Sequence, residues 1–252
     1  MGIGRRTGRG DAGVVEMKFF TQITTDITRS APKIPRGYKT AAAEQKMRKT
    51  PLGSFKSVMD QFRETADVDR YASIPVVVIP TDLWCRLGLV GYGYVLDARS
   101  FESNRRFIER ALSNPDYMRS LPSENRTDAY LFKILQQTHA SVAIAVVESP
   151  TIEYFLVHEL AHLVAADNPS ILPDPEIFED EYLDRRDEQF AHLEEMDYAK
   201  KRGMNFDEWF EMSWPNTMNV LRNPGADPEL YSLALMDYRD YQKLWRKTDA
   251  QN

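Results

Sequence analysis

A short apolar run followed directly by an apolar helix constrains the fold more than any other part of the chain. Residues 141–147 (SVAIAVV) predict a buried strand, because the run is short and rich in β-branched residues. Ser149 and Pro150 then supply an N-cap and a first-turn proline, and Pro169 stops the helix that they start. The sequence therefore predicts a strand that leads into a helix with apolar surroundings.

The predicted helix carries the pattern His158-Glu159-Leu160-Ala161-His162. Residues four apart in a helix project from the same face, so the imidazoles of His158 and His162 can converge on one metal ion, and zinc suits them. Glu159 falls beside the metal, where it can act as general base towards a zinc-bound water. Burying these three groups among apolar neighbours would be costly without a partner, and zinc is therefore the expected cofactor.

A catalytic zinc needs a third protein ligand, and an acidic stretch downstream offers several. A second long helix is predicted over residues 174–203, returning antiparallel to the first. On it, Glu188 is the preferred third ligand because its neighbourhood has a buried face, and Glu181 is the alternative. His192 lies one turn beyond Glu188, so it is an alternative ligand, a group that orients Glu188, or a surface histidine.

The remaining patterns predict an α+β protein. Residues 74–79 are β-branched and residues 91–97 alternate, so both stretches predict strands of a small mixed sheet. Helix starts are predicted at Asn205, by a capping-box pattern, and at Asp227, by a following proline. The C-terminal half is therefore expected to be mostly helical.

Composition indicates a soluble protein with an uneven distribution of charge. Its 252 residues are 42% hydrophobic, yet no run approaches the roughly 18 apolar residues of a membrane span, and no secretory signal is present. A cytoplasmic location without membrane partners is expected. Residues 1–50 carry a net charge of +7 and the rest −13. Residues 1–37 are interpreted as a flexible basic arm, which would bind nucleic acid only through scattered charges.

The motif and the downstream acid together resemble the gluzincin class of zinc metallopeptidases, in which His-Glu-x-x-His supplies two ligands and a later glutamate the third. Residues 187–191 (DEQFA) are similar to the Asn-Glu-Gly-Phe-Ala segment that carries the third ligand in one aminopeptidase branch. The pattern Glu188-x-x-Ala191 is loosely similar to the corresponding helix of ImmA/IrrE-type metallopeptidases. That group usually has Asn after this alanine, where His192 stands here.

This resemblance implies a zincin-like metallopeptidase domain over residues 38–252 that hydrolyses a protein or peptide substrate. It also implies that the strand at 141–147 is the edge strand that pairs with an extended substrate. The alternative function is a non-catalytic structural or interaction protein, of a phage-related kind, that retains the metal site. A second electrophilic donor is expected as well, and no spacing rule selects it among twelve tyrosines, which include Tyr182, Tyr198, Tyr231 and Tyr238.

Overall fold

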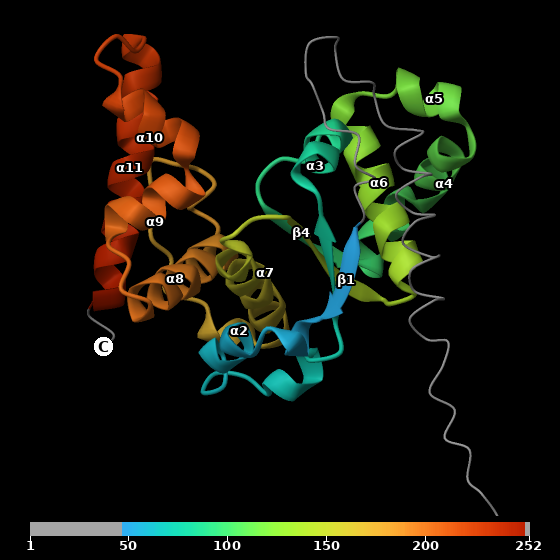
Figure 1. The fold of residues 1–252 in the computed structure, drawn as a ribbon, viewed down its shortest axis with the longest axis horizontal. Helices are drawn as coiled ribbons and strands as arrows, with labels where there is room; N and C mark the ends of the chain where they lie inside the picture. The colour runs from blue at the N-terminus through green and yellow to red at the C-terminus, as the bar shows by residue number, and fades with distance from the viewer. Residues whose placement is uncertain (1–46, 250–252) are drawn as a thin grey trace, which may run out of the picture. The chain divides into compact units, whose positions relative to one another are not determined.

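A computed structural model describes residues 47–249 of the chain (Figure 1). These residues form a small four-stranded sheet and a series of helices, and every regular element after residue 147 is helical. The predicted α+β class and mostly helical C-terminal half are therefore confirmed. The basic arm predicted at residues 1–37 lies outside the described residues.

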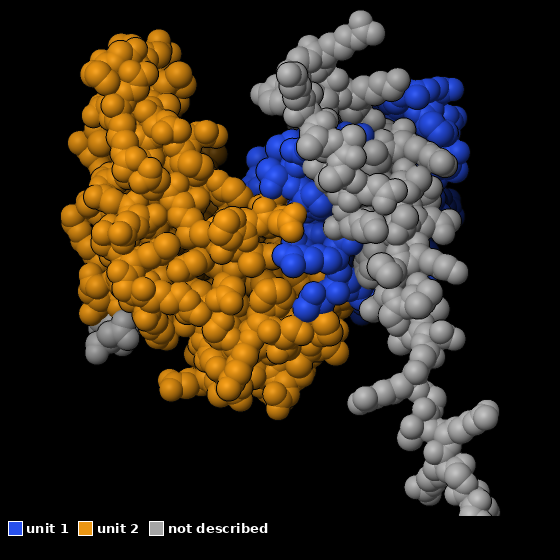
Figure 2. Space-filling model, in the orientation of Figure 1, with its two compact units in different colours: residues 1–50, 77–91, 96–143 blue, residues 51–76, 92–95, 144–252 orange. Residues whose placement is uncertain are grey.

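The chain divides into two compact units, which Figure 2 colours separately. Of the described residues, unit 1 comprises 47–50, 77–91 and 96–143, and unit 2 comprises 51–76, 92–95 and 144–249. The helices described in unit 1 are α3 (Thr81–Leu87), α4 (Arg105–Ser113), α5 (Pro115–Ser120) and α6 (Ser123–Thr138). Those of unit 2 are α2 (Lys56–Gln61), α7 (Ile152–Asp167), α8 (Arg186–Lys201), α9 (Phe206–Ser213), α10 (Pro215–Arg222) and α11 (Pro228–Asp249). One domain over residues 38–252 stays a prediction.

The four strands follow the order β1-β2-β4-β3 across the sheet. Their bounds are β1 Arg48–Pro51, β2 Pro75–Ile79, β3 Gly93–Asp97 and β4 Val142–Val147, so the three predicted strands are confirmed. β3 and β4 are antiparallel, because the Val147 N–H donates to the Tyr92 carbonyl at 3.0 Å and the Ala98 N–H to the Ser141 carbonyl at 2.9 Å.

The prediction that residues 141–147 form the edge strand is wrong. In the strand order, β4 lies between β2 and β3, and β3 stands at the end among the described residues. Five of the six residues of β4 are buried, so both of its faces are covered, and this explains why the strand is apolar throughout.

Helix α7 is apolar around most of its circumference, as expected of a helix that is covered on all sides. Its buried residues include Phe155, Leu156, Leu160 and Val164. It begins at Ile152 rather than at Pro150, because the Ser149 hydroxyl accepts from the Thr151 N–H at 3.1 Å and forms a turn before the helix. The sequence was right about the helix and wrong about its cap.

Helix α8 begins at Arg186, twelve residues later than the predicted start at residue 174. The preceding segment is irregular because side chains take its backbone groups away from helical bonding. Arg186 Nε donates to the Pro173 carbonyl at 2.7 Å, and Gln189 Nε2 donates to the Leu183 carbonyl at 2.7 Å. The helix ends as predicted before Gly203, which has a positive φ of 78°.

An aromatic core joins α8, α9 and α11 within unit 2. Trp209, Phe210 and Tyr241 are fully buried there. The predicted capping box is present at the start of α9, where Asn205 and Glu208 bond each other's backbone N–H groups. Among residues 47–249, no helix combines the length and the apolar character needed to cross a membrane.

Candidate metal centre

Helices α7 and α8 pack side by side and bring three metal-ligating side chains together (Figure 1). His158 Nε2 and His162 Nε2 are 3.3 Å apart. Glu188 Oε2 lies 3.5 Å from the first of these nitrogens and 3.4 Å from the second. Glu188 is buried, and both histidines are partly buried. Three potential ligand atoms therefore form a nearly equilateral triangle.

The size of this triangle fits a zinc ion. Zinc binds histidine nitrogen and carboxylate oxygen at about 2.0–2.2 Å, so two such ligand atoms on a tetrahedral ion are about 3.3–3.5 Å apart. The three measured separations fall within that range. Two imidazoles and one carboxylate are also a donor set that zinc accepts, with a position left for water or substrate.

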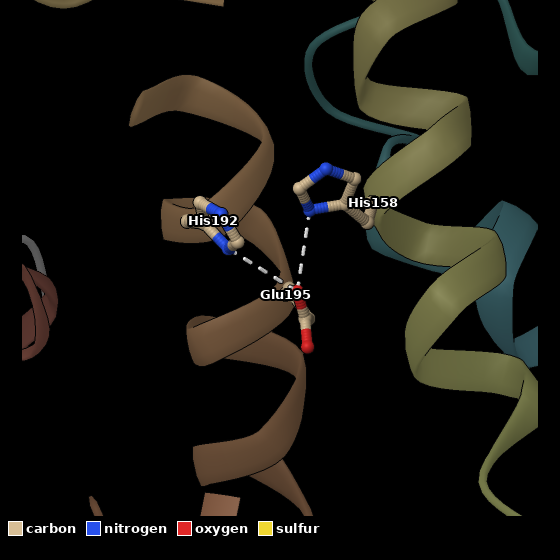
Figure 3. Close-up of side chains that lie close together, drawn as sticks. All are labelled: His158, His192 and Glu195. Carbon is tan, nitrogen blue, oxygen red and sulfur yellow. Dashed lines mark hydrogen bonds and ion pairs between the residues drawn. The ribbon is translucent and has the colours of Figure 1, made fainter. Parts of the chain in front are cut away.

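Glu195 lies on the Nδ1 side of His158 (Figure 3). Its Oε2 atom is 3.2 Å from His158 Nδ1. Its Oε1 atom accepts from Trp209 Nε1 at 2.9 Å and from the Ser213 hydroxyl at 3.0 Å, both from α9. A carboxylate in this position fixes the His158 tautomer with the proton on Nδ1, which leaves the Nε2 lone pair for a metal.

His192 is buried rather than on the surface. Its Nδ1 atom is 3.4 Å from Glu195 Oε2, and its ring centroid is 4.5 Å from that of His158 (Figure 3). His158, His192 and Glu195 therefore form a second group with metal-ligating atoms. Because Glu195 already accepts two hydrogen bonds from α9 and faces the proton-bearing nitrogen of His158, we assign this group to the support of the first.

Glu188 is held by two further residues that precede it in the chain. The Tyr182 hydroxyl donates a short hydrogen bond to Glu188 Oε2, and Arg185 Nη1 lies 3.4 Å from Oε1. Glu181, the alternative third ligand, is exposed on the irregular segment before α8 and belongs to neither group of ligating atoms. The structure thus brings Glu188, and not Glu181, to the two histidines.

The second ligand histidine also has a carboxylate behind it. Asp187 Oδ2 is 3.7 Å from His162 Nδ1, and Arg185 Nη2 holds the same oxygen at 2.6 Å. The distance to His162 is too long for a hydrogen bond, so this is an electrostatic contact. Each ligand histidine therefore turns its Nδ1 atom towards an acid and its Nε2 atom towards the triangle.

The site concentrates negative charge in a buried place, and this shifts its pKa values. Burial opposes the charged form of His158, but Glu188 and Glu195 outweigh it and raise the His158 pKa to about 10. Burial likewise opposes ionisation of the two acids, yet the neighbouring histidines lower the Glu188 pKa and bring that of Glu195 to about 2. The arrangement is thus one that requires a cation, which a proton or a metal ion supplies.

Glu159 is buried, with 7% of its surface exposed, and it lies close enough to His158, His162 and Glu188 to interact with them electrostatically. Burial raises its pKa above the usual glutamate value, whereas the charges of His158 and His162 lower it. A carboxylate whose proton affinity is increased in this way is suited to accept a proton from water. The geometry therefore combines three potential metal ligands with an adjacent carboxylate.

Glu195 was not singled out from the sequence. Its signal was available, because Glu188, His192 and Glu195 follow the spacing of one helix face, four and then three residues apart. Tyr182 was named only as one of several tyrosines, and nothing local in the sequence links it to Glu188. Trp209 and Ser213 lie on α9, so their bonds to Glu195 depend on tertiary packing alone.

We found no protein family, curated protein or solved structure that matches this chain.

Replacing Glu188 tests the ligand set. The Glu188→Ala variant should lose zinc affinity by more than about 100-fold, beyond the 10- to 100-fold typical of outer-shell changes. The exposed Glu181→Ala variant should bind zinc like the wild type. Competition with a chromogenic chelator measures both affinities. Equal zinc affinity of Glu188→Ala and wild type would remove Glu188 from the site.

Replacing Glu195 tests its support of His158. The Glu195→Gln variant should weaken zinc binding by about 10- to 100-fold, because the amide no longer presents a charged acceptor to His158 Nδ1. Glu194→Gln is the matched control, since Glu194 instead accepts from Gln61 Nε2 at 2.9 Å. Titration calorimetry should show unchanged zinc affinity for the control. A Glu195→Gln affinity equal to that of the control would contradict the assigned role.

Proposed function

We propose that this protein is a zinc-dependent hydrolase, specifically a metallopeptidase with a zincin-like arrangement of its active-site helix and its ligand helix. The observation that carries the proposal is the triangle of His158 Nε2, His162 Nε2 and Glu188 Oε2 with sides of 3.3–3.5 Å. Glu159 beside this triangle distinguishes a hydrolytic site from a purely structural one, because a structural zinc site needs no adjacent base.

His158, His162 and Glu188 would hold the metal, and Glu195 keeps the first of them in the binding tautomer. When bound, zinc supplies Lewis acidity that polarises a carbonyl group and increases the acidity of water. The Glu159 carboxylate accepts the proton of the attacking water and later delivers it to the departing amine. This role requires an ionised Glu159 before attack, and the positive charge of a bound metal ion would favour that state.

Tyr182 is the tyrosine best placed to donate a hydrogen bond to the reacting carbonyl oxygen. Its hydroxyl contacts Glu188 Oε2, one of the three ligating atoms, and its side chain is 40% exposed and accessible from solvent. Two other tyrosines named from the sequence are engaged elsewhere, Tyr198 with Glu153 and Tyr238 with Asp207. On substrate binding the Tyr182 O–H would turn from Glu188 Oε2 to the carbonyl oxygen, where a donor would stabilise the negative charge that develops.

A peptide is the substrate class that the surroundings of the site favour. Among residues 47–249, strand β3 stands at the end of the strand order, and its beginning lies against α7, where the Tyr92 ring stacks on Phe155 at 4.4 Å. The end strand of a sheet can add an extended peptide by backbone hydrogen bonds. A chain bound in that way would pass close to Glu159.

Glu159→Gln separates a hydrolase from a metal-binding protein without turnover. The variant should lose peptide cleavage by about 100- to 10,000-fold, because the amide cannot accept the proton of water. Its zinc content should equal that of the wild type, since Glu159 is not one of the three ligands. Mass spectrometry of a mixed peptide library, with zinc-loaded protein, measures the cleavage.

The result also decides the alternative function. Zinc binding by wild type and variant without cleavage by either would favour a structural or interaction protein that retains the metal site. Equal cleavage by both would contradict the role of Glu159 as the base.

Removing the Tyr182 hydroxyl tests the proposed donor. Tyr182→Phe should lower kcat on the order of 100-fold with little change in KM, because the lost hydrogen bond forms in the transition state. Tyr231→Phe is the control, as Tyr231 is an exposed residue of α11. Steady-state kinetics on a cleaved library peptide measures both constants. A Tyr182→Phe variant with the kcat of the control would show that the donor lies elsewhere.

A further inference from the structure

Gly93, at the start of β3, lies in close contact with Glu159. A Cβ atom at position 93 would be 2.5 Å from Glu159 Oε1, 2.7 Å from Cγ and 2.9 Å from Cδ. Carbon atoms of real side chains do not approach other atoms this closely. At Gly225, by contrast, the nearest atom to an added Cβ is 3.5 Å away. Any side chain at position 93 would therefore occupy the space of the Glu159 side chain.

Backbone conformation does not explain the glycine at this position. Gly91 has a φ of 72°, in the region that favours glycine, but Gly93 is not among the residues with positive φ. Other residues are therefore compatible with the backbone at position 93. What the glycine provides is space next to Glu159.

The backbone at position 93 is fixed on two sides by its neighbour Tyr92. The Tyr92 carbonyl accepts from the Val147 N–H at 3.0 Å, which ties the strand to β4. The Tyr92 ring stacks on Phe155 with a centroid distance of 4.4 Å and an interplanar angle of 5°. Phe155 precedes Glu159 by one helical turn, so the two contacts follow one face of α7. The strand cannot retreat from the helix without breaking this stack.

Glu159 would therefore have to move if position 93 carried a side chain. The crowded atoms include Cγ and Cδ, so a shift of the terminal oxygens alone does not relieve the contact. Relief requires another rotamer, and a new rotamer carries the carboxylate away from its present place beside the ligand histidines.

We propose that Gly93 is a positioning residue, whose missing side chain holds the Glu159 carboxylate beside the metal ligands. The contact between Gly93 and Glu159 stands on geometry alone, whereas its consequence for catalysis rests on the proposed function. Gly93 belongs to β3, and Glu159 is the proposed general base. Neither residue belongs to the proposed ligand set.

A double-mutant cycle on the full-length, zinc-loaded chain tests the contact without a substrate. Gly93→Ala should lower Tm by roughly 2–10 °C, as expected for one overpacked methyl group in a chain of this size. In a Glu159→Ala background the three crowding atoms are gone, and the same change should shift Tm by less than about 1 °C. Gly225→Ala should leave Tm unchanged in both backgrounds. An equal loss in Tm on both backgrounds would overturn the proposal.

Two further measurements report on the position of the Glu159 carboxylate. Gly93→Ala should retain zinc but lose on the order of 100-fold in kcat, the usual effect of a misplaced catalytic group. The second measurement uses cobalt-substituted protein and records the pH midpoint of its visible absorption change. In Gly93→Ala this midpoint should shift from the wild-type value towards that of Glu159→Ala. In Gly225→Ala it should equal the wild-type value. Wild-type kcat and a wild-type cobalt midpoint in Gly93→Ala would overturn the proposal. If the wild type cleaves no peptide, the proposed function fails, while the Tm cycle and the cobalt midpoint still decide the role of Gly93.

Discussion

Two buried carboxylates on one face of α8 are the constraint on which the site depends. Glu188 and Glu195 are removed from water, and a buried charge is tolerated only where partners compensate for the lost hydration. Glu195 is compensated by His158 from α7 and by Trp209 and Ser213 from α9. These bonds fix three helices of unit 2 around one side chain. The orientation of His158, and with it the direction of its Nε2 atom, follows from that compensation.

The aromatic core of unit 2 also packs around His192, the histidine next to Glu195. His192 lies among aromatic rings, with the Tyr241 ring centroid 5.0 Å away and that of Trp209 6.2 Å away. Such surroundings exclude water, and electrostatic interactions are stronger where water is excluded. The same packing that stabilises the C-terminal helices therefore strengthens the interaction between the carboxylates and the ligand histidines. Residues that stabilise the C-terminal helices therefore also surround the candidate metal site.

The groups proposed to act beside the metal come from segments outside the two central helices. Tyr182 belongs to the irregular segment before α8, where the N–H groups of Glu179 and Asp180 donate to the Asp240 carboxylate of α11 at 2.8 and 3.0 Å. Gly93 belongs to the start of β3. Helices α7 and α8 thus supply the proposed ligands and the proposed base. The segment before α8 and strand β3 supply the neighbouring residues Tyr182 and Gly93.

By itself the sequence determined the parts of this protein that depend on local geometry. The pairing of His158 with His162 follows from helical periodicity, and the strand before them and the capping box at Asn205 follow from equally local rules. The sequence favoured Glu188 as the third candidate ligand but left Glu181 open, because the choice depends on where α8 begins. Hydrogen bonds from Arg186 and Gln189 to the preceding segment decide that. The sequence did not indicate the strand order, the support of His158 by Glu195 or the contact between Gly93 and Glu159. Only tertiary structure decided these, since each joins groups whose separation in space is unrelated to their spacing along the chain.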